Sequence, residues 1–419
     1  MANSDLTPTE VFDNGAGPVQ TMKGHVPSVI AGFSGWTLDS FDFFLVVFCL
    51  TSMAKEFGKS DKDMALALTM TLLFRPVGAF IFGMMADRLG RRMPLMVNIG
   101  FFAVAEIMTA LSPNYWTLMV VRAVFGIVMG GNWGVSTSLA LEGAPVSKRG
   151  VISGLLQEGY AAGNMLAAIS FLFLFNKLGW RPLFFLGSLP AILLVLFIRF
   201  KVRESPVWIS SVQKIKKTLT RAEKNREILS HWKLFAFLVA FMTMMLFASH
   251  GTQDMYPTFL QRQWHFTPQQ RSVFTLVGGA GAIFGGLLFG HLSSTWGRRR
   301  TIIIAFVIGL IVIWPWAFAS SKAVLMLGVF LIQFAVQGAW GIVPVHLAEL
   351  SPTSVRGLLP GLAYQTAGII ASSVVYIEPY IAEKRGYGSA MAIVAAVVFI
   401  LASIMTALSK ERRGESFEN

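Results

Sequence analysis

The stretch Gly83–Arg92 reads GMMADRLGRR, and the stretch Gly290–Arg299, which begins 207 residues later, reads GHLSSTWGRR. The same shift brings further small and polar residues into register without a gap. Beyond these two stretches, the identical pairs are Gly131/Gly338, Trp133/Trp340, Gly134/Gly341, Glu142/Glu349, Pro145/Pro352, Ser147/Ser354, Arg149/Arg356 and Gly150/Gly357. Because an apolar composition alone does not repeat polar identities in register, we interpret the chain as two related halves of the same orientation.

The composition is that of a membrane protein. Of the 419 residues, 54% are hydrophobic and 14% are charged, whereas soluble domains contain about 25% charged residues. Apolar segments long enough to cross a bilayer recur through both halves. They lie near 29–53, 64–86, 94–111, 116–141, 150–175, 181–199, 234–259, 271–293, 301–319, 323–348, 357–380 and 388–408. We therefore expect an all-α membrane protein with twelve transmembrane helices in two six-helix bundles.

The distribution of basic residues predicts the orientation. With the N-terminus inside, 23 of the 35 lysine and arginine residues fall in inner segments and 10 in outer segments. The positive-inside rule then places both termini in the cytoplasm of a multi-pass protein of the cell (inner) membrane. The net charge of +13 is explained by this topology, so we expect no nucleic-acid partner. Residues 1–27 contain three acids and no apolar core, which is not the pattern of a cleaved signal peptide.

One long polar interruption, residues 201–232, separates the halves. The predicted parts are a cytoplasmic tail 1–27, a bundle 28–200, a basic linker 201–232, a bundle 233–409 and a second tail 410–419. Within the linker, apolar residues from Trp208 to Leu219 are spaced as on an amphipathic helix, which lies either on the membrane surface or in solvent. The single cysteine, Cys49, excludes a disulfide framework, and we expect no metal site. Gly58-Lys59-Ser60 lacks the first glycine of a phosphate-binding loop, so ATP is not expected.

Four charged residues lie within apolar segments of the first half: Asp39, Asp42, Arg75 and Arg122. Charges at this depth are costly unless they are paired, hydrated or neutralised. Asp39 and Asp42 project from one helix face, because residues three apart are neighbours on a helix. We expect the arginines to meet these acids. Such a pair either locks the helices permanently or opens when the acid is protonated, which frees a charge to bind an anion. Glu106, in the third segment, has no evident partner.

The seventh segment carries a strip of polar residues, from Ser249 to Thr258. His250 and Asp254 are four residues apart, so they share a helix face, and histidine titrates near neutral pH. Pro257 cannot donate to the carbonyl of Gln253, which predicts a break in the helix there. The strip either carries substrate and protons or serves as hydrogen-bonding contacts between helices.

The sequence resembles the major facilitator superfamily. Gly83-x3-Asp87-Arg88-x-Gly90-Arg91-Arg92 resembles the family's loop motif between the second and third helices, and Arg122-x3-Gly126-x3-Gly130 resembles its fourth-helix motif. The resemblance covers essentially the whole chain. It implies that Asp87 holds the cytoplasmic ends of the two halves together. In the second loop, Ser294 and Thr295 replace the acid and the base. The expected gating residues are Asp87, Arg88, Arg91, Glu142, Arg149, Glu349 and Arg356.

Further resemblances suggest the substrate. An acid in helix 1 facing an arginine in helix 4 is similar to sugar:proton and aromatic-acid:proton symporters, and the acid-x-x-acid form resembles carboxylate carriers. The pattern around His250 is similar to lactate/pyruvate:proton permeases and their sialate:proton relatives, although the usual upstream asparagine is replaced. We therefore predict a symporter of a proton and a small organic anion, most simply a monocarboxylate such as lactate or pyruvate. It would act as a monomer, driven by the proton gradient without a cofactor.

Candidate residues follow from these patterns. For substrate binding they are Arg122, Arg75, His250, Gln253, Asn132, Gln157, Tyr364 and Gln337. For proton coupling they are Asp39, Asp42, Asp254 and His250. The alternatives are a carrier of sialate or another organic acid, a drug:proton antiporter, and a non-transporting membrane receptor. The two membrane arginines disfavour the antiporter. We find no nucleophile–base or metal pattern that would indicate an enzyme.

Overall fold

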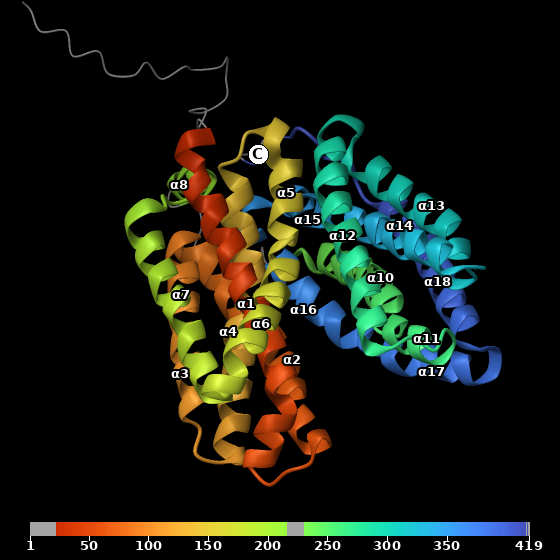
Figure 1. The fold of residues 1–419 in the computed structure, drawn as a ribbon. Helices are drawn as coiled ribbons and strands as arrows, with labels where there is room; N and C mark the ends of the chain where they lie inside the picture. Colours follow the sequence, from red (N-terminus) through yellow and green to blue (C-terminus); the bar gives the residue numbers. More distant parts are fainter. Residues whose placement is uncertain (1–21, 216–229, 416, 418–419) are drawn as a thin grey trace, which may run out of the picture.

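The computed structural model describes residues 22–215, 230–415 and 417 (Figure 1). These residues are almost entirely helical, and none of them forms a strand. The predicted all-α class is therefore correct. Our interpretations of residues 1–21 and of 216–229 lie outside the described residues.

The first half is a bundle of helices from α1 to α7. Its elements are α1 (Met22–Glu56), α2 (Asp61–Leu89), α3 (Arg92–Leu111), α4 (Tyr115–Glu142), α5 (Arg149–Gln157), α6 (Gly159–Leu178) and α7 (Trp180–Lys201), with the 3-10 turn η1 (Val146–Lys148) before α5. The linker contains α8 (Pro206–Ile215), which covers the first part of the predicted amphipathic helix.

The second half is a bundle of helices from α10 to α18. Its elements are α10 (Trp232–Gln253), α11 (Tyr256–Arg262), α12 (Pro268–Trp296), α13 (Arg298–Ala317), α14 (Lys322–Trp340), α15 (Val343–Leu350), α16 (Leu359–Ala371), α17 (Val374–Arg385) and α18 (Tyr387–Leu408), with the 3-10 turn η2 (Thr353–Val355) before α16. α10 ends at Gln253, so the break predicted from Pro257 is confirmed.

Eleven stretches of the described residues are long and apolar enough to span a membrane. The twelfth predicted segment, 357–380, falls on α16 and α17, which a short turn at Ser372 and Ser373 separates. Large apolar side chains such as Leu172, Leu276 and Ile311 are exposed on the outside of the bundles, as expected for surfaces that face lipid.

The internal repeat extends to local structure. Ser60 and Asp63 form a capping box at the start of α2, and Thr267 and Gln270, 207 residues later, form the equivalent box on α12. A capping box satisfies two backbone amides that would otherwise have no partner at a helix start. The two halves therefore begin equivalent helices with the same device.

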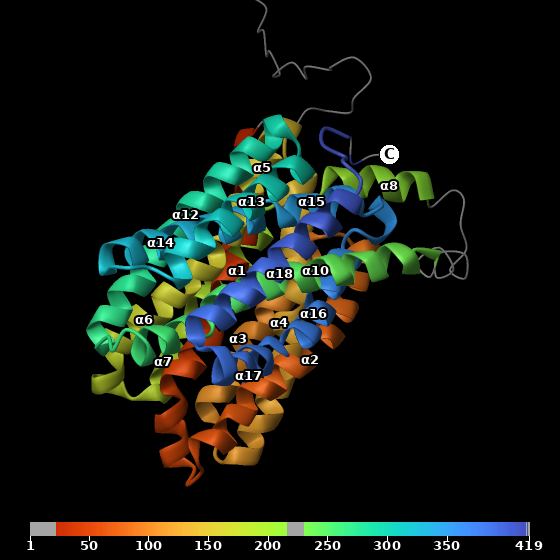
Figure 2. The same cartoon turned by 90° about the vertical axis from the view of Figure 1, so that its right-hand side faces the viewer.

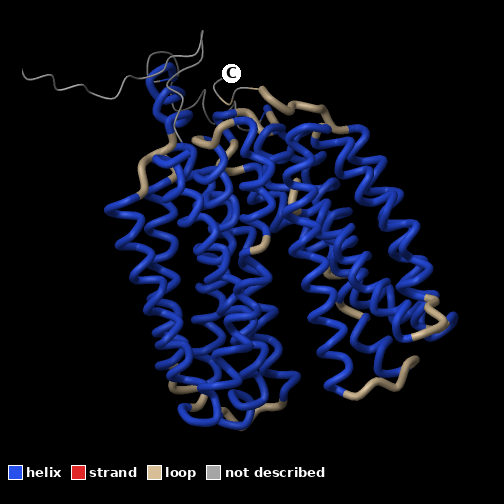
Figure 3. Tube along the Cα trace, turned by 45° about the horizontal axis from the view of Figure 1, so that its top comes forward, coloured by secondary structure: helices blue, strands red, loops and turns tan. Residues whose placement is uncertain are grey.

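The halves are in close contact near one face of the molecule. The start of α1, α8 and the C-terminal residues lie at that face, which we call the terminal face (Figures 1 and 2). Near it, glycines bring helices of the two halves together: a Cβ on Gly290 of α12 would lie 2.6 Å from the Gly150 carbonyl oxygen of α5. Toward the opposite face the two bundles separate (Figure 3). The protein is thus closed at the terminal face.

Candidate functional site

Arg122 of α4 forms a buried ion pair with Asp42 of α1. Its Nη1 donates to Asp42 Oδ2 at 2.7 Å, and its Nη2 donates to Asp42 Oδ1 at 3.2 Å and to Thr109 Oγ1 at 2.6 Å. The guanidinium also lies over the rings of Phe125 and Phe184, at 4.3 and 5.7 Å. The predicted contact between a helix-1 acid and a helix-4 arginine is therefore present, and both terminal nitrogens of Arg122 are engaged.

Arg75 of α2 is in a different position. Its Nε and Nη2 are buried and have no hydrogen-bond partner among the described residues. Asp39 is fully buried as well, and neither of its carboxyl oxygens has a partner there. The Asn132 amide and the Arg75 guanidinium act on Asp39 electrostatically, and the Tyr364 hydroxyl is another polar neighbour of Arg75. Our expectation that both arginines pair closely with the two aspartates is fulfilled only by Arg122.

Other candidates of the first half lie around this centre. Asn132 joins α4 to α1, because its Nδ2 donates to the Gly35 carbonyl at 2.8 Å and its Oδ1 accepts from Ser136 at 2.7 Å. These contacts make Asn132 a helix-packing residue as much as a ligand candidate. Gln157 lies at the end of α5, with a buried Oε1 that has no partner in the described part of the chain.

Tyr364 of α16 lies at the junction of the two halves. Its ring centre is 4.9 Å from that of Trp133 and 6.0 Å from that of Trp340, and these two tryptophans are equivalent in the repeat. A third tryptophan, Trp36 of α1, is 6.2 Å away. The tyrosine is therefore at the midline of the molecule, beside Arg75.

In the second half, the polar strip of α10 forms as predicted. His250 Nδ1 lies 3.1 Å from Asp254 Oδ2, and these side chains are 44% and 42% exposed although they belong to a spanning segment. Gln253 donates to Gln333 at 2.8 Å. Gln337 donates to Ser249 at 3.3 Å. Asp254 also acts electrostatically on Tyr160 of the first half, so the strip faces the space between the bundles.

Two further acids, to which the sequence assigned no role, are buried within the helices. Within the described residues, Glu106 of α3 is fully buried with no hydrogen-bond partner for either oxygen, and Glu378 of α17 is buried with an unpartnered Oε1. Glu378 is close to Gly251 of α10 and interacts with Asp254. The signal for Glu378 was available, since it is an isolated acid within the apolar segment 357–380.

The terminal face is held closed by a buried network that includes three predicted gating residues. Arg91 Nη2 lies 2.9 Å from Glu142 Oε1, and Arg91 Nη1 lies 2.8 Å from Asp87 Oδ1. Asp87 in turn accepts from the backbone amides of Gly357 at 2.7 Å and Leu358 at 3.0 Å, which belong to the other half. Burial lowers the pKa of Arg91, but the carboxylates of Glu142 and Asp87 outweigh it and raise the pKa above its ordinary value.

The linker supports this network. Ser205 Oγ donates to Glu142, and the indole Nε1 of Trp208 donates to the Asp87 carbonyl oxygen at 3.1 Å. Arg88, the remaining predicted gating residue between α2 and α3, lies in the last turn of α2. The linker helix α8 is therefore packed against the closed face.

The second half repeats the ion pair, but its described residues show no counterpart of the hydrogen bonds that Asp87 accepts from the backbone of the other half. Arg298 Nη2 lies 3.0 Å from Glu349 Oε1, which is the pair equivalent to Arg91 and Glu142. Ser294 replaces the acid of Asp87. Arg356 reaches Glu142 at 3.9 Å, and burial lowers its pKa only to about 10, so it stays charged at neutral pH.

Our prediction that Arg149 forms a salt bridge of the gate is wrong. Among the described residues it forms no ion pair within 4.0 Å. Its Nη1 donates instead to the Glu415 carbonyl oxygen at 3.0 Å, and its guanidinium lies 3.6 Å from the Phe417 ring. The pattern of acids and bases at helix ends could not show that the C-terminal tail, and not an acid, contacts Arg149.

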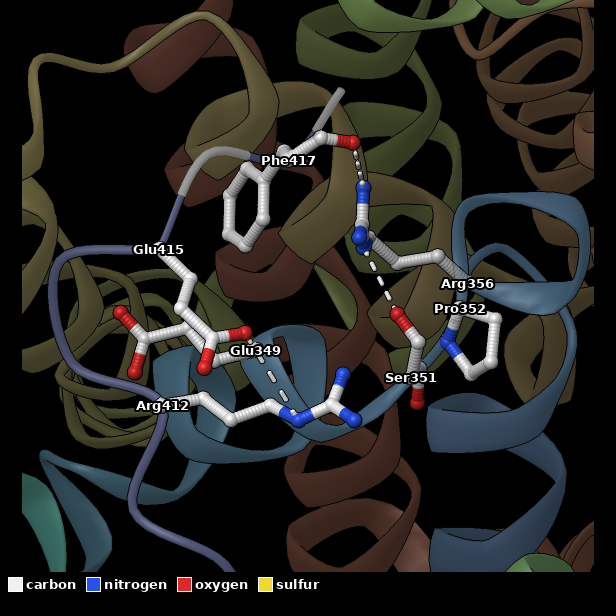
Figure 4. Close-up of a pocket in the computed structure, with 7 residues that line it drawn as sticks. All are labelled: Glu349, Ser351, Pro352, Arg356, Arg412, Glu415 and Phe417. Atoms are coloured by element: carbon white, nitrogen blue, oxygen red, sulfur yellow. Dashed lines mark hydrogen bonds and ion pairs between the residues drawn. The ribbon is translucent and has the colours of Figure 1, made fainter. Parts of the chain in front are cut away.

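The tail joins the repeat-related arginines of the two halves. The buried Phe417 ring lies 4.2 Å from the Arg356 guanidinium as well, and its carbonyl oxygen accepts from Arg356 Nη1 at 3.3 Å. Beside it is a cavity of about 360 Å³, shown in Figure 4. The cavity is lined by Glu349, Ser351, Pro352, Arg356, Arg412, Glu415 and Phe417. This cavity lies at the terminal face, away from Arg75 and Asp39.

Comparisons with known proteins agree with this architecture. The Sugar (and other) transporter family model matches residues 21–230, and the Major Facilitator Superfamily model matches residues 255–418. The chain is 31% identical to a carboxylic acid transporter protein homolog of Saccharomyces cerevisiae, over 88% of this chain and 65% of the yeast protein. It is 28% identical to the sialic acid transporter NanX of Escherichia coli, over 88% of this chain and 90% of the relative.

A solved structure shows the same fold. The proton:xylose symporter XylE, bound to 6-bromo-6-deoxy-D-glucose, superimposes with a TM-score of 0.75 at 18% identity, over 95% of this chain and 98% of XylE. The relatives, the spanning helices and the repeated gate describe a multi-pass membrane transporter, consistent with the inner membrane and not an enzyme. The chain belongs to the major facilitator superfamily.

Proposed function

We propose that this protein is a proton-coupled symporter of small organic carboxylates, with a monocarboxylate such as lactate or pyruvate as the first candidate. The terminal face would be cytoplasmic, in line with the excess of lysine and arginine on that side. The protein would work by alternating access, in which the two halves rock about a central site. The conformation described above would then be the state that is closed to the cytoplasm.

The observation that carries the proposal is the incompletely satisfied guanidinium of Arg75. Two of its nitrogens are buried without a partner among the described residues, and such groups are costly to leave unsatisfied. A ligand carboxylate supplies two acceptor oxygens in the geometry that a guanidinium matches. Arg122, by contrast, already donates to Asp42 and Thr109. We therefore assign Arg75 to the substrate and the Arg122–Asp42 pair to proton handling.

The second half supplies the other side of the site. His250 and Asp254 are accessible and face the first half, so protons and substrate can reach them from the open side. Gln253 and Gln337 are held by Gln333 and Ser249, which keeps their amides near the same region. These groups offer hydrogen bonds to the hydroxyl or carbonyl of a small carboxylate.

The relatives support the substrate class. The two relatives named above carry the names of acid transporters, one of carboxylic acids and one of sialic acid. The carboxyl group is the common element, and it is the group that Arg75 fits. The chain spans about 65% of the length of the yeast relative.

Uptake of radiolabelled lactate into proteoliposomes under an inward proton gradient tests the proposal. We expect protonophore-sensitive uptake that Arg75→Gln abolishes and that Arg262→Gln, a change at an exposed arginine of α11, leaves intact. Competition by unlabelled sialate or pyruvate identifies the preferred acid. Absence of flux with every carboxylate would refute the substrate class, and uptake that persists in Arg75→Gln would refute the role of this arginine.

A further inference from the structure

Among the described residues of the first half, one buried cluster contains three acids and two arginines. Asp39 and Asp42 of α1 and Glu106 of α3 are all fully buried. Two arginines, Arg75 of α2 and Arg122 of α4, lie among them. Three ionised carboxyl groups against two guanidiniums would leave a net negative charge among buried groups, which is unfavourable.

Asp42 is hydrogen-bonded to an arginine and Asp39 is acted on by one electrostatically, whereas Glu106 receives a hydrogen bond from neither arginine. Asp42 takes two hydrogen bonds from Arg122, and Arg75 acts on Asp39. A further hydrogen bond of Arg122 Nη2 goes to Thr109. No hydrogen-bond donor of the described residues reaches either oxygen of Glu106.

Glu106 has identified neighbours on α1, α4 and α7. From α1 the Asp42 carboxyl faces it, and from α4 the Arg122 guanidinium acts on it more weakly. From α7 it meets backbone, because a Cβ on Gly187 would lie 3.5 Å from Glu106 Oε2. The Asp42 charge also acts on the buried thiol of Cys49. The principal polar neighbour of Glu106 is thus another carboxyl.

Two neighbouring carboxyl groups that are both buried tend to share a proton, because ionising both would place two like charges side by side away from bulk water. We propose that Glu106 carries a proton and donates it in a hydrogen bond to Asp42, so that the two acids bind one proton opposite the single charge of Arg122. Glu106 is then a proton-coupling residue of the transport cycle. This step rests on the proposed symport.

Release of the proton breaks the Glu106 O–H bond and transfers the proton to water, which leaves two carboxylates facing one guanidinium. That state is stabilised only when water enters. The three acids are fully buried in the conformation closed at the terminal face, so loading and release require a change of conformation. Binding and release of the proton are therefore coupled to the movement of the two halves.

Infrared spectroscopy of the reconstituted protein at neutral pH tests the protonation directly. A protonated carboxylic acid has a carbonyl stretching band that a carboxylate lacks. We expect the difference spectrum between the parent protein and Glu106→Gln to contain this band, and the difference with Asp39→Asn to lack it. A band that disappears in Asp39→Asn instead, or in neither variant, would overturn the proposal.

Transport measurements test the role in coupling. We expect Glu106→Gln to lose gradient-driven accumulation of lactate but to keep exchange of lactate across the membrane, which requires no net proton movement. Glu106→Asp, which retains a titratable group, should recover part of the accumulation, and Glu383→Gln, at an exposed acid of α17, should match the parent. Protonophore-sensitive accumulation by Glu106→Gln at the parent level would overturn the assignment. If the parent protein transports no carboxylate, the proposed function fails, and the infrared result still decides where the proton lies.

Discussion

A single methyl group at Gly290 should open the closed face of this transporter. Gly290 of α12 faces Gly150 of α5 across the boundary between the halves, and a Cβ at position 290 would lie 2.6 Å from the Gly150 carbonyl oxygen. Real Cβ atoms do not approach a backbone oxygen this closely, and a carbonyl within a helix cannot turn aside. In Gly290→Ala the two helices must therefore move apart.

The size of the effect follows from this overlap. Overpacking of a tight contact costs about 1–3 kcal/mol, and the cost falls only on the state in which α5 and α12 touch. A conformational equilibrium would then shift by roughly 5- to 150-fold away from the closed face. Gly279→Ala is the matched control, since it adds the same methyl group to the same helix where nothing lies within 4 Å.

Double electron–electron resonance, which measures the distance between two spin labels, detects this shift when the labels are placed at positions 62 and 322. Lys62 and Lys322 are exposed, in the first turns of α2 and α14 at the opposite face. When the terminal face opens, that opposite face closes, so Gly290→Ala should increase the population of short distances. Equal distance distributions for Gly290→Ala and Gly279→Ala would refute the reasoning that this glycine contact sets the conformational balance.

Three other changes test the remaining contacts. Asp87→Asn removes the negative charge of the carboxylate that accepts hydrogen bonds from the amides of Gly357 and Leu358. The same spin labels should then report opening of the terminal face, and unchanged distances would contradict a gating role of Asp87. Phe417→Ala removes a ring that contacts two arginines, each contact contributing about 0.5–2 kcal/mol, and should shift the equilibrium in the same direction, with no shift if the tail only covers the surface. Arg122→Leu leaves Asp42 buried without its partner, which costs about 3–5 kcal/mol, so the melting temperature should fall and the added change Asp42→Asn should restore part of it; additive losses would contradict the pairing.

The fold was accessible from the sequence because it depends on features that are local or repeated. Hydropathy marks a spanning segment within itself, and Pro257 breaks its helix through its own missing N–H. The repeat located the equivalent gate residues, and the Arg91–Glu142 pair recurs as Arg298–Glu349. Each of these features is determined by a few neighbouring residues or occurs in both halves of the repeat.

The arrangement of the buried charges was less accessible, because it depends on how helices distant in sequence are rotated and packed. Arg75 and Arg122 looked alike as isolated bases in apolar segments, yet only Arg122 is bound tightly to an acid. The sequence showed Glu106 as an acid within an apolar segment, but it could not show that its neighbour is Asp42, which lies on another helix. The place of Phe417 between two arginines could not be inferred from a short polar tail.

The repeat also separates the two tasks of the molecule. The gate residues Arg91, Glu142 and Arg149 are duplicated, whereas the buried charges are not: at the shift of 207 residues, Asp42, Arg75 and Arg122 correspond to Ser249, Ala282 and Val329. The duplicated ion pair stabilises the end of each half where the two halves close against each other. The buried charges serve one proton and one substrate, and a second copy would double the cost of desolvated charge. The second half instead places His250, Asp254 and Glu378 at positions of its own, so the asymmetric residues are those in which the chemistry of transport should be sought.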